Sequence, residues 1–297
     1  MFSLNKEKIQ ESKKIGSGRF STVFPYQKEA TDERWVVKVV EAKNSNQFKL
    51  QLENVVASSN QSHPSIVPVR GYAFEEQGSE GWKTYIKMPK MKSNLKDLKD
   101  DYTNKKNTIS KDQMIRYVYS IASALEYLEK KRVPHQNIKP SNILMDQNGK
   151  VYLSDFGAPK FASEEEKTKV PKELGGAELY MAPELFTADK PLKRSALFKA
   201  DVWSFGAVFA ELGSSKPRPI TPSLSNDDKA KLIKEIIADL RKNYGQTVPD
   251  LISSALSIDP AQRKSFSEIT QVLEAKYSSE LVREFQKRLC NRYFSKG

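Results

Sequence analysis

Two glycines and a lysine near the start of the chain have residue types and spacing that suit phosphate binding. Gly16 and Gly18 lie in the stretch IGSGRFSTVF, and Lys38 stands in the middle of the apolar run WVVKVV. A glycine lets the backbone bend tightly and approach a phosphate closely, because it carries no Cβ atom. The alternative is an ordinary hairpin, since Ser21 stands where the usual G-x-G-x-x-G pattern has its third glycine.

Lys38 indicates a nearby anion, because a cation flanked by valines is costly in a strand unless it is paired. A phosphate or a carboxylate would suit it. Glu53, on the helical stretch that follows, is the natural carboxylate, and a Lys38–Glu53 ion pair would direct the ammonium group toward nucleotide phosphates. The alternative for Glu53 is a solvated glutamate on a helix surface.

The elements that must position these residues change in character along the chain. Up to about Met88 the sequence predicts a strand-rich region with one helix at 45–60. The predicted strands cover residues 12–27, 34–42, 66–76 and 83–88. After Met88 to Lys92 the pattern becomes helical, most clearly at 110–131, where apolar residues recur at helical spacing.

The second part of the chain carries one further strand signal among its helices. Asn148-Gly149, between two apolar runs, predicts a β-hairpin. The stretches DVWSFGAVFAEL and DKAKLIKEIIADLRKNYG predict helices. The last residues place Leu281, Phe285 and Leu289 on one helical face, which predicts an amphipathic helix packed on its own domain; a membrane or partner helix is the alternative.

Composition limits the class of protein. A chain of 297 residues with 38% hydrophobic residues suits one large domain or two lobes. No apolar run reaches the roughly 18 residues of a membrane span, and the start lacks the apolar stretch of a secretory signal. The single cysteine, Cys290, excludes an internal disulfide and cysteine-rich zinc sites. We therefore expect an intracellular protein, cytoplasmic or nuclear, with no transmembrane segment.

The net charge of +12 is spread along the sequence. Such a distribution favours solvated basic faces over a specific nucleic-acid site, although acidic partners, phosphates and anionic lipids would also be attracted.

Four motifs follow one another between residues 135 and 206: HQNIKPSNIL at 135–144, DFG at 155–157, MAPE at 181–184 and DVWSFG at 201–206. The set is far more specific than any one motif, because four independent patterns would have to agree by chance. From about residue 10 to 275 the chain resembles a eukaryotic protein kinase domain of the Ser/Thr type.

This resemblance implies an α+β bilobal protein kinase fold, with a small β-rich N-lobe and a larger, mainly helical C-lobe. The expected parts are an N-terminal extension (1–9), the N-lobe (10–88), a hinge (89–92), the C-lobe (93–275) and the C-terminal amphipathic helix (276–297).

The resemblance also implies ATP and magnesium as cofactors and a protein as partner or substrate. Asp155 matches the aspartate that binds magnesium bridging the nucleotide phosphates, and Asn142 matches the ligand of a second ion. Lys139 matches the lysine that neutralises the transferring phosphoryl group. Beside Gly16, Gly18, Lys38 and Glu53, the expected nucleotide-binding residues are Val23, Val36, Met88, Lys90, Met91 and Leu144.

Other matching positions imply structural roles. Glu184 and Arg263 match the pair that braces the larger lobe, while His135, Phe156 and Asp201 match packing and anchoring positions. These residues are expected to hold the site in place without taking part in the chemistry.

Three departures from the family pattern fall in one contact set. Asn137 occupies the position of the general base, and an amide has no usable basicity. Gln136 replaces an arginine that in many kinases binds phosphate on the activation loop, and Ala177 replaces a threonine whose hydroxyl would contact the base and Lys139. Taken separately, Gln136 and Ala177 are open to the reading of ordinary family variation.

A fourth departure concerns the nucleotide itself. Val36 takes the place of the alanine expected beside adenine, and its extra methyl groups would narrow that pocket at a cost of about 1 to 3 kcal/mol if nothing yields. Ser163 and Thr168 are candidate phosphorylation sites in the activation loop, with ordinary loop polarity as the alternative.

The sequence therefore predicts a protein that binds ATP and magnesium but is catalytically impaired, and that acts as a scaffold or allosteric partner. The main alternative is an active Ser/Thr kinase in which Asn137 is tolerated or engineered, because much of phosphoryl-transfer catalysis lies outside the base. A basic binding module without nucleotide is the third reading.

Overall fold

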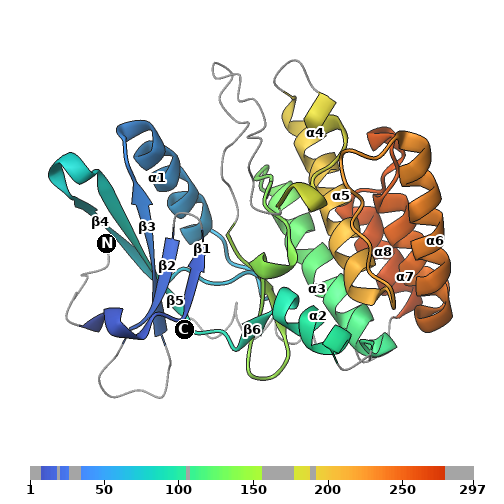
Figure 1. Ribbon diagram of the computed structural model, residues 1–297, viewed down its shortest axis with the longest axis horizontal. Helices are drawn as coiled ribbons and strands as arrows, with labels where there is room; N and C mark the ends of the chain where they lie inside the picture. The colour runs from blue at the N-terminus through green and yellow to red at the C-terminus, as the bar shows by residue number, and fades with distance from the viewer. Residues whose placement is uncertain are drawn as a thin grey trace.

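The chain folds into two lobes that differ in secondary structure (Figure 1). The computed structural model describes residues 8–18, 21–26, 35–104, 108–155, 177–187 and 192–277. The first lobe is built on a β-sheet, and the second is mostly helical. The predicted α+β bilobal architecture is confirmed.

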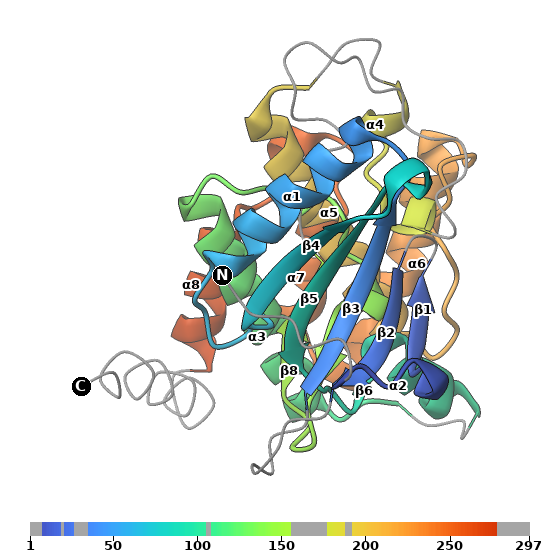
Figure 2. The same ribbon diagram turned by 90° about the vertical axis from the view of Figure 1, so that its left-hand side faces the viewer.

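The sheet of the first lobe has five antiparallel strands in the order β1-β2-β3-β5-β4 (Figure 2). One helix, α1, packs against β3 and β5. Asn44 caps the start of α1, because its side chain accepts a hydrogen bond from the backbone N–H of Gln47. The bounds are β1 Gly16–Gly18, β2 Ser21–Tyr26, β3 Trp35–Ala42, α1 Ser45–Ser59, β4 Gly71–Glu76 and β5 Trp82–Pro89, with 3-10 turns at Glu11–Lys13 and Gly78–Glu80.

The two faces of this sheet carry different side chains. Val37 and Val39 belong to a small hydrophobic core on one face, together with Tyr26, Trp35 and Tyr85. Side chains alternate along a strand. Lys38 therefore lies on the opposite face, the one toward α1, and this strand alternation is what turns the lysine toward the second lobe.

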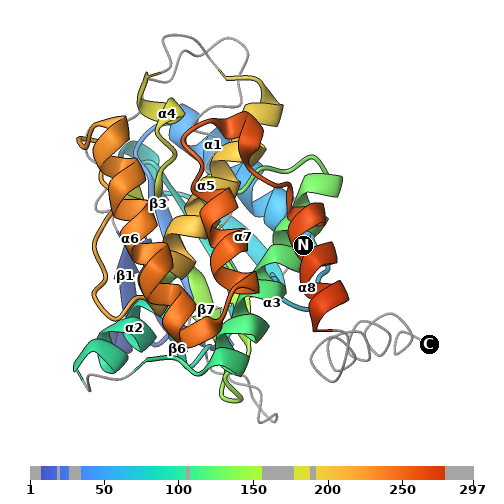
Figure 3. The same ribbon diagram turned by 90° about the vertical axis from the view of Figure 1, so that its right-hand side faces the viewer.

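The second lobe combines seven described helices with a three-stranded sheet in the order β6-β7-β8. Figure 3 shows α7 between α6 and α8, in front of α5. The bounds are β6 Ser93–Asn94, α2 Leu95–Asn104, α3 Lys111–Lys130, β7 Ile143–Met145, β8 Val151–Leu153, α4 Glu184–Thr187, α5 Arg194–Gly213, α6 Asn226–Tyr244, α7 Thr247–Ala255 and α8 Phe266–Lys276, with 3-10 turns at Pro140–Asn142, Ala177–Tyr180 and Pro260–Gln262.

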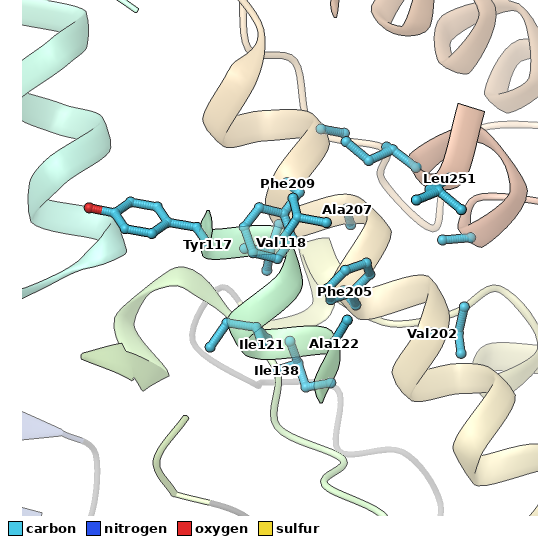
Figure 4. Packing of buried hydrophobic residues seen from close by; sticks show 14 of the residues in the cluster. Tyr117, Val118, Ile121, Ala122, Ile138, Val202, Phe205, Ala207, Phe209 and Leu251 are labelled. Carbon is cyan, nitrogen blue, oxygen red and sulfur yellow. The ribbon is translucent and has the colours of Figure 1, made fainter. Parts of the chain in front are cut away.

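The core of the second lobe forms around α3 and α5 (Figure 4). Phe205 and Phe209 are fully buried with ring centroids 4.9 Å apart, and Phe205 meets Phe266 of α8 edge to face at 5.6 Å. Gly206 permits the close approach of α5 and α7, since a Cβ atom there would lie 2.8 Å from Cβ of Ala255. This core supports the loop that follows α3, because Ile138 of that loop is one of its buried members.

The predicted elements agree with the observed ones except at a few places. The run predicted as a strand at 66–76 is a strand only over Gly71–Glu76, because Pro68 has no N–H to offer a ladder. Ile66 instead makes an isolated bridge to Leu153, which ties the first lobe to the second. The run predicted at 12–27 divides into β1 and β2.

The predicted Asn148-Gly149 hairpin is confirmed, with antiparallel β7 and β8 on either side and Gly149 at φ +74°. In the described parts of the chain, no helix is both long enough and apolar enough to cross a membrane. Residues 278–297, which hold most of the predicted C-terminal helix (276–297), its apolar face and Cys290, lie outside the described residues.

Candidate functional site

Lys38 and Asp155 meet where the two lobes come together. Nζ of Lys38 lies 2.6 Å from Oδ1 of Asp155, although 117 positions separate them in sequence. The Lys38 side chain is 16% exposed and that of Asp155 is 37% exposed. Burial by itself would raise the pKa of Asp155, but the Lys38 ammonium, with help from His135 and Lys139, lowers that pKa below its ordinary value. The carboxylate is therefore charged at neutral pH and able to ligate a cation.

The expected Lys38–Glu53 ion pair does not form in this structure. Glu53 is exposed on α1, and within the described residues it has no hydrogen bond or ion pair. The side of α1 that faces the sheet presents Gln51, which accepts a hydrogen bond from Oγ1 of Thr84 at 3.1 Å. Two positions along a helix correspond to a rotation of about 200°, so a helix that turns Gln51 inward turns Glu53 outward.

The loop after α3 is anchored by Asp201 of α5. Its two carboxylate oxygens accept hydrogen bonds from the backbone N–H groups of His135 at 2.6 Å and Gln136 at 2.7 Å. Burial raises the pKa of Asp201 to about 7, and the two N–H donors oppose that rise. These contacts agree with the anchoring role expected from the sequence.

His135 joins the same loop to the end of β8. Its Nδ1 accepts from the backbone N–H of Asn137 at 3.2 Å, so Nε2 carries the hydrogen and donates to the carbonyl of Ser154 at 3.1 Å. Burial lowers the pKa of His135 to about 4, which keeps the ring neutral near pH 7. His135 is thus a packing residue, as expected.

Gln136 adopts a left-handed backbone conformation that the sequence did not predict. Its φ is +58°, a left-handed value that costs a residue with a side chain about 1 to 3 kcal/mol. Its amide oxygen is buried without a hydrogen-bond partner among the described residues. Glutamine therefore fits this position poorly, and the hydrogen bonds to Asp201 hold the backbone there.

Asn137, Asn142 and Asp155 are linked directly. The amide nitrogen of Asn137 donates to the backbone carbonyl of Asp155 at 3.2 Å, and the amide nitrogen of Asn142 donates to the backbone carbonyl of Asn137 at 2.8 Å. Asn142 is buried, and its own carbonyl accepts from both the N–H and the hydroxyl of Ser154. Because its amide nitrogen is used in the bond to Asn137, the amide oxygen is the side-chain atom of Asn142 that could ligate a cation.

A metal ion at this site would need ligands from outside the protein. Within the described residues, no group of three or more His, Cys, Asp or Glu side chains could hold a metal by itself. Magnesium is commonly bound by one or two protein carboxylates together with phosphate oxygens and water. Asp155 and Asn142 fit that arrangement if a nucleotide supplies the remaining oxygens.

The predicted phosphate-binding residues lie on neighbouring strands. Gly16 pairs with Val23 across β1 and β2, and Val23 pairs with Lys38 across β2 and β3. A Cβ atom on Gly16 would make only ordinary contacts, the nearest at 3.9 Å, so packing within the protein does not require glycine there. Gly18 pairs with Ser21 at the end of the hairpin.

The residues predicted around the adenine lie on the first sheet, just after β5, and on β7 of the second lobe. Val36 pairs with Met88 and is almost fully buried, which means that protein atoms already cover its methyl groups. Lys90 is exposed and Met91 is half-buried after β5, while Leu144 is half-buried on β7. Their contact with a nucleotide stays a prediction.

Other predicted residues divide into those that the structure explains and those that lie outside it. Both carboxylate oxygens of Glu184 accept from the guanidinium of Arg263, at 2.6 and 2.9 Å, as expected of a brace. Phe156, Ser163 and Thr168 lie outside the described residues, as does the side chain of Ala177.

Sequence reasoning missed a second charged group, on α2 and α5. Oε1 of Glu211 lies 2.9 Å from Nζ of Lys99, and its Oε2 accepts from the hydroxyl of Tyr180 at 2.5 Å. The three residues are far apart in the sequence and belong to no periodic pattern, so nothing in the sequence pointed to their meeting.

Comparisons with known proteins agree with this geometry. A family model described as "Protein kinase domain" matches residues 9–278. The chain is similar to an Aurora kinase of Saccharomyces cerevisiae, with 27% identity over 90% of this chain and 69% of that protein. It is 29% identical to the serine/threonine-protein kinase RUNKEL of Arabidopsis thaliana and 28% identical to human 3-phosphoinositide-dependent protein kinase 1. Those two alignments cover about nine-tenths of this chain but only 18% and 45% of the relatives.

Proposed function

Because the chain belongs to the protein kinase domain family, we propose that it binds ATP with magnesium between its lobes and is impaired in phosphoryl transfer. The observation that carries this proposal is the grouping of Lys38, Asn142 and Asp155 around position 137, which holds an amide in place of a carboxylate. An amide cannot accept the proton of a substrate hydroxyl at neutral pH, so the site keeps cation and phosphate binding without its base.

Each retained residue has a distinct task in nucleotide binding. Lys38 would exchange the Asp155 carboxylate for phosphate oxygens, and Asp155 and Asn142 would then ligate magnesium. A magnesium ion held by these two residues would supply positive charge that offsets the charge of the phosphates. Gly16 supports the same proposal. Packing within the protein does not require a glycine there, whereas the close approach of a ligand would.

The output of such a protein would be conformational. General-base catalysis supplies a rate factor of roughly a hundred to ten thousand, so its loss would slow phosphoryl transfer by that factor while leaving nucleotide binding intact. We infer a scaffold or allosteric partner of another protein, whose conformation depends on whether nucleotide is bound.

The test is a thermal melt with ATP, with and without magnesium. A ligand that binds only the folded state raises the melting temperature in step with the logarithm of its concentration over its dissociation constant. We expect a magnesium-dependent rise with ATP, loss of that rise in Lys38→Ala, and its retention in the matched control Lys43→Ala, whose lysine is exposed just after β3. No shift at millimolar ATP would overturn nucleotide binding.

A second candidate is an active Ser/Thr protein kinase. It is favoured by the relatives, which are named as kinases, and by Lys139, whose charge is close enough to contribute to the lowered pKa of Asp155. It predicts measurable transfer of radiolabelled phosphate from ATP to a generic protein substrate by the unmodified chain. ATP binding without transfer would exclude it and leave the impaired protein.

A further inference from the structure

The amide of Asn137 makes a contact that the aspartate of the family pattern could not make. Its nitrogen donates to the backbone carbonyl of Asp155 at 3.2 Å. An ionised carboxylate has no hydrogen to donate. An aspartate at position 137 would instead place negative charge beside that carbonyl oxygen.

The backbone of Asn137 is fixed by two hydrogen bonds of its own. Its backbone N–H donates to Nδ1 of His135 at 3.2 Å, and its carbonyl accepts from the amide of Asn142 at 2.8 Å. His135 is in turn fixed through its backbone N–H by the buried Asp201. The Asn137 amide therefore projects from a backbone that is anchored on both sides.

The backbone of Asp155 has a conformation that requires support from neighbouring residues. Its φ of +57° lies in the left-handed region, which residues with a side chain seldom adopt and which persists only where surrounding contacts impose it. Lys38 holds the carboxylate at 2.6 Å, and Asn137 holds the carbonyl. The two contacts fix the two ends of the residue.

We propose that Asn137 is a positioning residue that locks the backbone of Asp155 in the orientation used to ligate magnesium, which rests on the proposed function for that last step. The change from aspartate to asparagine therefore does more than remove a base. It adds a donor that links the loop after α3 to the metal-binding residue.

Hydrogen exchange of the metal-free and nucleotide-free protein tests the lock directly. The probe is the segment from 151 to 155, where the N–H groups of Leu153 and Ser154 bond to Ser65 and Asn142. We expect Asn137→Ala and Asn137→Asp to speed exchange of this segment about two- to tenfold, as for the loss of one hydrogen bond, while α5 is unchanged. Asn243→Asp, which adds the same charge at an exposed position on α6, should match the unmodified protein.

Several results would overturn the lock. One is exchange in Asn137→Ala that is as slow as in the unmodified protein. Another is faster exchange in Asn137→Asp alone, which would indicate charge repulsion without a donor role. A third is faster exchange throughout the protein. Failure of Asn137→Ala to fold would also count against it, because a positioning residue is not needed for folding.

A second readout separates positioning from general support. At fixed ATP, the magnesium concentration that gives half of the melting shift should rise several-fold in Asn137→Ala, whereas a merely structural role would lower the melting temperature and leave this midpoint unchanged. If the unmodified protein shows no ATP shift, the proposed function fails, and the exchange experiment still decides the role of Asn137.

Discussion

The two sides of the loop after α3 are built in opposite ways. On the α5 side, Asp201 and Arg263 are buried; Asp201 accepts two short hydrogen bonds and Arg263 donates four. On the side toward the first lobe, Lys38 and Asp155 are partly exposed and hold each other by one contact, while Glu53 faces solvent. Gln136 and Asn137, the two residues of the loop that depart from the kinase pattern, lie between these sides. The loop keeps its place because the α5 side fixes its backbone, whatever side chains it carries.

Removing Arg263 should be the most damaging way to break the α5 side. Its guanidinium is fully buried and donates to both oxygens of Glu184 and to the carbonyls of Lys199 and Ser257. Arg263→Ala leaves these acceptors unpaired, so we expect urea denaturation to show a loss of about 3 to 5 kcal/mol.

The matched control for Arg263 is Arg218. It forms an ion pair with Glu235 at 2.6 Å, but both side chains are about half exposed. Arg218→Ala should cost no more than about 1 kcal/mol. Equal losses in the two variants would mean that Arg263 is not a brace and would remove the contrast between the two sides.

Asp201→Asn should weaken the α5 side less, and in a way that depends on pH. An amide cannot accept both N–H groups equally well, so we expect a loss of about 1 to 3 kcal/mol. Burial, with a smaller contribution from the charge of Glu129, raises the pKa of Asp201 to about 7. The folded state therefore keeps a proton that the unfolded chain releases near pH 4, and the stability from this group falls as pH rises from about 4 to 7.

The measurement for Asp201 is urea denaturation at several pH values. The difference between the unmodified protein and Asp201→Asn should be largest near pH 4 and shrink toward pH 7. Glu235→Gln is the control of opposite sign, because Arg218 lowers the pKa of Glu235 and its stabilisation is lost as pH falls. A difference that grows with pH in Asp201→Asn would show that this carboxyl is charged in the folded protein.

A double-mutant cycle on Lys38 and Asp155 measures the side toward the first lobe. Because Asp155 is more than one-third exposed, we expect a coupling energy of about 1 kcal/mol or less between Lys38→Ala and Asp155→Ala. A coupling of several kcal/mol would make this pair a structural element comparable with Arg263 and Glu184.

The contrast between the α5 side and the side toward the first lobe also explains how much of the structure could be predicted from the sequence. Strand alternation and helical periodicity predicted the lobes, and the ordered motifs predicted that residues 135–142, Asp155 and Asp201 would meet. The left-handed backbone of Gln136 and Asp155 could not be predicted, because long-range hydrogen bonds impose it against local preference. The partner of Lys38 was predicted wrongly, because the sequence did not fix the rotation of α1 about its axis. One rotation turns Glu53 toward the sheet, and the observed one turns Gln51 toward it.

Glu53→Gln should have the smallest effect. Glu53 is exposed and unpaired within the described residues, so its substitution should change the free energy of unfolding by less than about 0.5 kcal/mol and leave the ATP melting shift unchanged. Gln51→Ala, on the inward side of α1, should cost about 1 kcal/mol through the lost bonds to Thr84 and Glu41. If Glu53→Gln instead reduces the ATP shift, α1 must rotate when nucleotide binds so that Glu53 reaches Lys38. The side toward the first lobe would then be assembled by the ligand, while the α5 side is assembled by folding.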